Sequence, residues 1–148
     1  MTLGKTFAER QEGLQRWGFT CTCPLCSLPH AHRVASDVRR TLIAQADKKI
    51  IEIWKEGRHA DAIALAEEII EMIQEEGLEH FLTDEYALLA KLWLLYGKRE
   101  KAEEIGKKSF EMLAGMGYFG NEVDHERWDL EKFLDVVGDG MKEVKGAP

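Results

Sequence analysis

Residues 50–72 read IIEIWKEGRHADAIALAEEIIEM, and residues 88–112 read LLAKLWLLYGKREKAEEIGKKSFEM. The two stretches align at an offset of 40 residues, which pairs Gly57 with Gly97, Ala62 with Ala102 and Ala66 with Gly106. Apolar residues recur three and four positions apart on both sides of each glycine, the pattern of amphipathic helices. Each copy therefore predicts a helix, a glycine turn and a second helix, and the repeat predicts a stack of antiparallel helical hairpins.

The turn glycine and the small residue five positions later resemble the tetratricopeptide repeat (TPR), in which small residues let paired helices pack closely. The offset of 40 residues is longer than the usual TPR period of about 34. The consensus aromatic positions and the terminal proline of that repeat are also missing. The resemblance implies a TPR-like stack with extended helices, and an unrelated antiparallel bundle is the alternative.

Helix signals continue on both sides of the repeat. Thr6 and Glu9 form a capping box before a short helix of about ten residues that ends near Trp17 and Gly18. Ser36 is expected to be the N-cap of a long helix. That helix is expected to bury a stripe made by Val38, Leu42, Ala46, Ile50, Ile53 and Trp54.

A last helix is expected after Asn121, and it should cap the stack because two repeats alone bury little of each other. Its apolar positions are Val123, Leu130, Phe133, Leu134 and Val137. The predicted fold class is therefore all-α, with helical hairpins preceded by a short helix and a cysteine-rich segment. We assign residues 1–35 to this first part and residues 36–148 to the TPR-like helical domain.

Composition narrows the classes of protein. The chain has 148 residues, 45% of them apolar, enough to bury the core of one ordinary domain. The segment through Arg40 carries six basic and three acidic residues, so its charge is +3. The net charge of the chain is −7, so the rest of the chain carries −10. An acidic body argues against nucleic-acid binding through a broad basic face, and a local basic patch beside the cysteines is the alternative that stays open. No secretory signal or membrane span is recognisable, so we expect a soluble intracellular protein of the cytoplasm or nucleus.

All three cysteines, Cys21, Cys23 and Cys26, lie in the segment WGFTCTCPLC at residues 17–26. Three cysteines so close together make a poor disulfide framework. Their spacing can place three thiolates around one zinc ion, which prefers four nitrogen or sulfur ligands. The fourth ligand could come from His30 or His32, or from outside the chain. A free thiol cluster without metal is the remaining alternative.

The segment WGFTCTCPLC, the preceding TFAERQEGLQR and the helical repeats resemble the C-terminal part of fungal SET-domain proteins. These are related to the SET and MYND (SMYD) class of protein-lysine methyltransferases. The resemblance implies that Cys21, Cys23 and Cys26 are post-SET zinc ligands, completed by a cysteine of the Asn-His-x-Cys motif in the SET core. It also implies that Phe19 is a vestige of the aromatic residue that borders the adenine of S-adenosylmethionine. The alternative for Phe19 is a hydrophobic plug beneath the cysteine segment.

No Asn-His-x-Cys motif occurs in the sequence. The Gly-x-Gly cofactor loop and the catalytic tyrosine of that class should fall before Met1. We therefore expect a truncated SET-domain protein with an incomplete zinc site, which is not an enzyme by itself. S-adenosylmethionine and a histone or other protein substrate would belong to the intact family protein. The helical repeats are expected to bind a protein partner, and the alternative function is a stand-alone TPR-like interaction module with a small zinc knuckle.

Overall fold

The computed structural model of the chain describes residues 4–117 and 128–137, which form helices and no strand. The elements are α1 (Phe7–Gln15), α2 (His30–Lys55), α3 (His59–Glu75), the short 3-10 turn η1 (Glu79–Phe81), α4 (Leu82–Leu95), α5 (Arg99–Gly115) and α6 (Leu130–Val137). The predicted all-helical class is confirmed for this part of the chain, and Val123 lies outside it. Within the same ranges, no helix combines the length and the apolar character that crossing a membrane requires.

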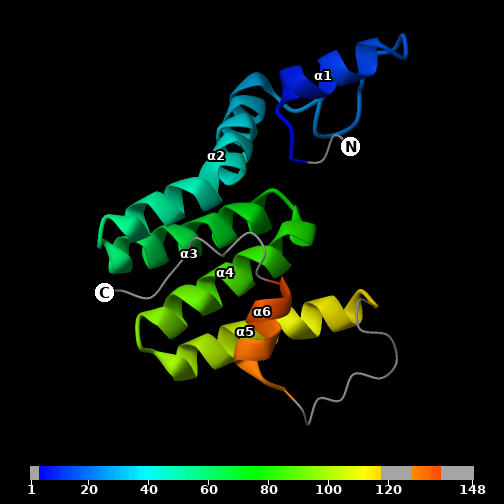
Figure 1. Cartoon of the computed structure of the whole chain (residues 1–148). Coiled ribbons are helices and arrows are strands. Elements are labelled where there is room, and N and C mark those ends of the chain that lie inside the picture. Colours follow the sequence, from blue (N-terminus) through cyan, green and yellow to red (C-terminus); the bar gives the residue numbers. More distant parts are fainter. Residues whose placement is uncertain (1–3, 118–127, 138–148) are drawn as a thin grey trace.

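From α2 to α5, each helix packs against the next one and runs in the opposite direction (Figure 1). The glycines predicted to form turns end these helices. Gly57 has a φ of 84° and Gly97 a φ of 91°, in the left-handed region that glycine enters without a Cβ penalty. The chain therefore reverses within a few residues, which brings the helices on each side of the turn together.

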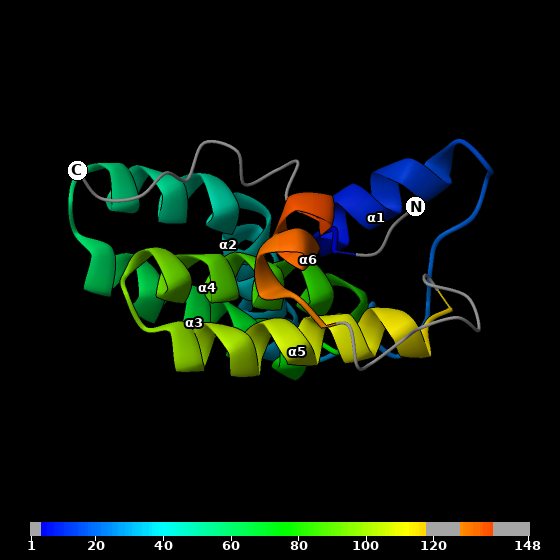
Figure 2. The same cartoon turned by 60° about the horizontal axis from the view of Figure 1, so that its bottom comes forward.

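The core lies between α2, α3, α4, α5 and α6. Its largest fully buried apolar side chains are Ile50, Ile69, Ile73, Leu92 and Leu130. Helix α6 crosses α4 and α5 (Figure 2). A Cβ atom at Gly106 would lie 2.6 Å from Cδ1 of Leu130 and 3.6 Å from Cβ of Ala90. The absent side chain at position 106 therefore lets α4, α5 and α6 approach closely.

Helix α2 differs from the prediction at its N-terminal end. It begins at His30, directly after Pro29, so Ser36 is a buried residue inside the helix and not its N-cap. Val38 and Leu42 are 53% and 41% exposed. The predicted stripe is buried only in the C-terminal half of α2, because no described helix packs on its N-terminal half at these positions.

The N-terminal half of α2 is held to the end of α3 by a buried polar cluster. Glu76 Oε2 accepts hydrogen bonds from Ser36 Oγ at 2.7 Å and from Arg40 Nε at 2.9 Å. Glu76 Oε1 accepts a third hydrogen bond from Arg39 Nε at 2.7 Å. The side chains of Arg40 and Glu76 are 5% and 3% exposed. In this half of α2, the ion pair of Arg40 and Glu76 therefore makes the buried contact that the sequence pattern assigned to apolar side chains.

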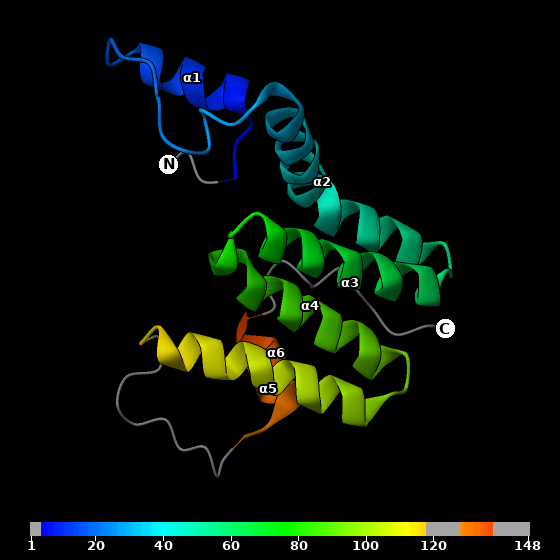
Figure 3. The ribbon, with the colours of Figure 1, turned by 180° about the vertical axis from the view of Figure 1, so that it is seen from behind.

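Helix α1 lies at the outer end of α2, away from α4 and α5 (Figure 3). The predicted capping box at its start is present, with Glu9 N–H donating to Thr6 Oγ1 and Thr6 N–H donating to Glu9 Oε2. The contacts that attach α1 to α2 include a hydrogen bond from Phe7 N–H to Asp37 Oδ1 at 2.8 Å and the Arg33 guanidinium, which lies 4.0 Å from the centre of the Phe7 ring.

Candidate metal centre

Three thiols converge in the loop between α1 and α2. The sulfur atoms of Cys21, Cys23 and Cys26 all lie within 4.8 Å of one another. In a tetrahedral zinc site with Zn–S bonds of about 2.3 Å, the sulfurs are about 3.8 Å apart, so a small contraction would fit the ion. All three cysteines are free thiols. Among the described residues, no other group of three or more histidine, cysteine or acidic side chains is arranged to share a metal ion.

Two side chains of α1 position the cysteines. The Gln11 amide holds the backbone of Cys21 from both sides, donating to Cys21 O at 3.0 Å and accepting from Cys21 N–H at 3.1 Å. Arg10 Nε donates to the buried sulfur of Cys26 at 3.4 Å. The loop is closed further by a hydrogen bond from Ser27 N–H to Cys23 O at 2.9 Å. The sulfurs are therefore held by a folded frame of hydrogen bonds around the loop.

Arg10 also supplies a charge that suits a metal thiolate site. It is 5% exposed, and its Nη2 has no hydrogen-bond partner among the described residues. A buried guanidinium is costly unless negative charge lies beside it. Zn²⁺ with three thiolates carries a net charge of −1, which the neighbouring Arg10 would balance. The donor set and its surroundings therefore fit zinc.

The thiols differ in acidity. A hydrogen bond from the backbone N–H of Cys26, followed by one from the Cys21 side chain, lowers the pKa of Cys23 to about 7. A backbone hydrogen bond from Cys23 also lowers the pKa of Cys21, but the side-chain hydrogen bonds of the other two cysteines and burial outweigh it, so that pKa is raised. Cys23 is therefore substantially thiolate, the form that binds metals, near neutral pH.

The two histidines predicted as local ligands stand apart from the cysteine group. His30 and His32 are exposed and lie in the first turn of α2, since that helix begins earlier than the sequence indicated. Neither belongs to the group of atoms that could share a metal ion. His30 Nδ1 instead lies 3.4 Å from Nη2 of Arg33. The described residues therefore bring three thiol ligands together and no histidine.

Phe19 does not fill the space beneath the cysteines, so the plug interpretation is wrong. Phe19 is 54% exposed and Trp17 is 78% exposed. The buried side of the segment is formed by Arg10 and Cys26 instead. We call Trp17 and Phe19 the aromatic patch, two exposed aromatic side chains just before Cys21 in the chain.

Sequence reasoning missed Arg10 and Gln11 as parts of this site. A signal for Arg10 was present, because it lies three residues after Phe7 and four before Leu14 and so shares their helix face. A charged residue on the apolar face of a short helix indicates a partner of opposite charge. No comparable pattern marks Gln11.

Comparison of the chain with known protein families, with curated proteins and with solved structures finds no match. Three adjacent thiols, one of them acidic, can bind a thiophilic metal ion such as zinc.

Proposed function

We propose that this chain is the post-SET and helical part of a SET-domain-like protein, binding zinc through Cys21, Cys23 and Cys26. A fourth ligand would come from another polypeptide segment. One observation carries the proposal: three thiol sulfurs converge beside a buried arginine with no fourth ligand among the described residues. The aromatic patch supports it, because exposed aromatic residues are typical of surfaces that contact another protein segment.

The helical part is proposed to be a TPR-like platform that binds a protein partner. The repeat at an offset of 40 residues, the glycine turns and the alternating helix directions support this. Val34, Val38 and Leu42 add an exposed apolar stripe along α2. That stripe is also the observation that favours the second candidate function, a stand-alone interaction module with a zinc knuckle. Thiolate coordination favours a reducing, intracellular compartment for either function.

Zinc binding tests the proposal directly. The purified chain should bind one equivalent of zinc, measured by competition with a coloured chelator. Cys23→Ser should lower the affinity by at least about tenfold, because a thiolate ligand is lost. The double variant His30→Ala/His32→Ala should bind zinc as the original chain does. Zinc binding that survives Cys23→Ser, or that disappears in the histidine variant, would show that the ligand set is wrong.

Cobalt(II) distinguishes an open fourth position from a closed one. The cobalt-loaded chain should show thiolate-to-cobalt charge-transfer absorption, and added imidazole should change the visible bands by entering the fourth position. A spectrum indifferent to imidazole would mean that the chain closes the site itself, and the proposal of a ligand from another segment would fail.

The chain by itself is expected to transfer no methyl group. Methyl transfer to lysine depends on positioning and electrostatic stabilisation, and Phe19 supplies one wall of such a site at most. One aromatic contact contributes about 1 kcal/mol, whereas micromolar cofactor binding needs about 8 kcal/mol. Calorimetric titration with S-adenosylmethionine should show no binding heat, and labelled-methyl transfer to histones should stay at background. Micromolar binding would contradict a non-catalytic role.

A further inference from the structure

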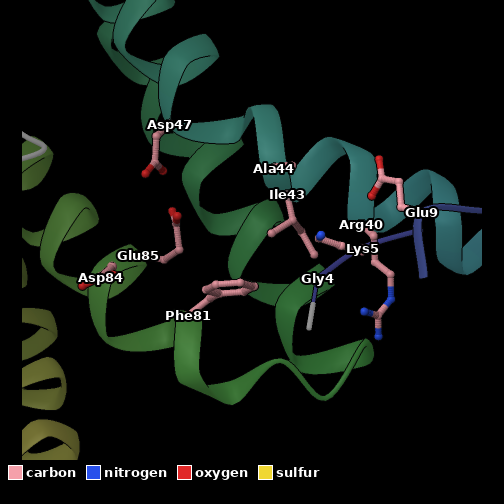
Figure 4. Close-up of a pocket in the computed structure, with 10 residues that line it drawn as sticks. All are labelled: Gly4, Lys5, Glu9, Arg40, Ile43, Ala44, Asp47, Phe81, Asp84 and Glu85. Carbon is pink, nitrogen blue, oxygen red and sulfur yellow. The ribbon is translucent and has the colours of Figure 1, made fainter. Parts of the chain in front are cut away.

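A cavity of about 460 Å³ lies between α2, the start of α4 and the segment that leads into α1 (Figure 4). It is distant in the chain from the cysteines. Its wall combines apolar and charged side chains, among them Ile43, Phe81, Lys5, Asp47 and Glu85. Gly4 packs on the Phe81 ring so closely that a Cβ atom there would lie 3.2 Å from the ring. Contacts between distant parts of the chain thus build this cavity.

Glu85 is the unusual member of the wall. It is 6% exposed, and its carboxylate points across the cavity toward that of Asp47 on α2 (Figure 4). Its Oε2 atom is completely buried and has no hydrogen-bond partner among the described residues. An oxygen that accepts no hydrogen bond from the protein is open to a hydrogen-bond donor carried by a ligand.

The acidic side chains gathered around Glu85 favour a ligand of positive charge. Burial, followed by the hydrogen bond and charge of Asp47 and the charge of Asp84, raises the pKa of Glu85 to about 9. The charged groups that share this cavity are Asp47 and Arg40 on α2, Asp84 on α4, Glu9 on α1 and Lys5 of the N-terminal segment. Without a ligand, Glu85 therefore holds a proton at neutral pH. A cation placed between Glu85 and Asp47 can replace this proton.

The size and lining of the cavity select the kind of cation. Among the described residues, only the three cysteines are arranged to share a metal ion. The carboxylates of Asp47, Asp84 and Glu85 are not arranged in this way. The volume is in the range of small-molecule sites, about 300–1,000 Å³. Phe81 and Ile43 offer apolar contact, and an aromatic ring also attracts cations. An organic cation fits these walls better than a metal ion.

We propose that this cavity binds a small organic cation with one primary ammonium group, which donates hydrogen bonds to Glu85 and Asp47 while its apolar chain lies against Phe81 and Ile43. Asp47 is exposed, so the proposed ammonium site can be reached from solvent. Lys5 extends into the opposite side of the cavity (Figure 4). Its positive charge disfavours a second ammonium group, so monoamines should bind better than diamines.

The test is a titration of the full-length ¹⁵N-labelled chain with pentylamine, followed by NMR at about pH 8, where an alkylamine is still charged. Saturable shifts are expected for the backbone amides of Asp47, Phe81 and Glu85. Glu85→Gln keeps the size of the side chain and removes its charge, and it should weaken binding by at least about tenfold. Circular dichroism of this variant checks that it is folded.

One control variant and two control ligands test whether binding depends on the charge of Glu85 and on a single ammonium group. Glu79→Gln makes the same charge change at an exposed residue outside the cavity wall and should leave the affinity within about twofold. Pentan-1-ol has the shape of pentylamine without its charge and should bind much more weakly, and 1,5-diaminopentane should be weaker as well. The proposal is overturned if pentylamine causes no shifts, if Glu85→Gln binds it unchanged, if pentan-1-ol binds equally, or if calcium alone shifts the same amides.

Discussion

Glu76→Ala should lower the free energy of unfolding by about 3–5 kcal/mol, the typical effect of removing one partner from a buried ion pair. The variant removes the carboxylate that pairs with Arg40, whose side chain is 5% exposed, and it removes the acceptor of Ser36 and Arg39. Chemical denaturation at neutral pH, monitored by circular dichroism, measures the change.

The adjacent Glu75 provides the control. Its side chain is 64% exposed and lies 3.7 Å from Arg39 Nε, so Glu75→Ala should cost less than about 1 kcal/mol. Equal effects of the two variants would show that the Glu76 cluster is not the stabilising contact described above. Replacing Arg40 and Glu76 together by methionine should recover most of the loss, because no buried charge then remains unpaired.

The effect of Glu76→Ala should also depend on pH. Burial raises the pKa of Glu76, but the hydrogen bonds from Ser36, Arg39 and Arg40 outweigh it, so the pKa is lowered in the folded chain. The folded state therefore favours the ionised form. Its stabilisation is complete above the pKa of an ordinary glutamate and is lost as the pH falls through the lowered pKa. The difference between the original chain and the variant should shrink in acid.

Glu85→Gln should raise the free energy of unfolding, the opposite of the effect expected for Glu76→Ala. The gain should increase as the pH rises. The pKa of Glu85 is about 9 in the folded chain and 4.5 for an ordinary glutamate. Between these values the folded state binds a proton that the unfolded state has released, so stability falls as the pH increases. The loss is at most about 1.4 kcal/mol per pH unit. Glutamine does not titrate, so the variant escapes this loss.

Denaturant unfolding of both chains at three pH values across that window measures the difference. We expect similar stabilities near the acid end and an advantage of several kcal/mol for Glu85→Gln near the alkaline end. Glu79→Gln, at an exposed position, should follow the original chain throughout. A constant difference between Glu85→Gln and the original chain would mean that Glu85 does not titrate as its burial implies.

Local features of this protein could be predicted from the sequence. The capping box of Thr6 and Glu9 and the turn at Gly57 depend on residues within one helical turn, so short-range chemistry fixes them. The cysteine cluster belongs to the same class. Cys21, Cys23 and Cys26 lie within six residues, so the chain can hardly fold without bringing them close. Whether they bind zinc stays a prediction.

Tertiary structure decided the features that join distant segments. Glu76 contacts Arg40 across 36 residues, and Glu85 faces Asp47 from another helix. Helical periodicity places a side chain on a face of its helix, but it does not say which other helix covers that face. Val38 and Leu42 therefore looked like core residues and are exposed, while Ser36 and Arg40 are buried. Burial and pKa depend on atoms brought together by packing, and these are far apart in the sequence.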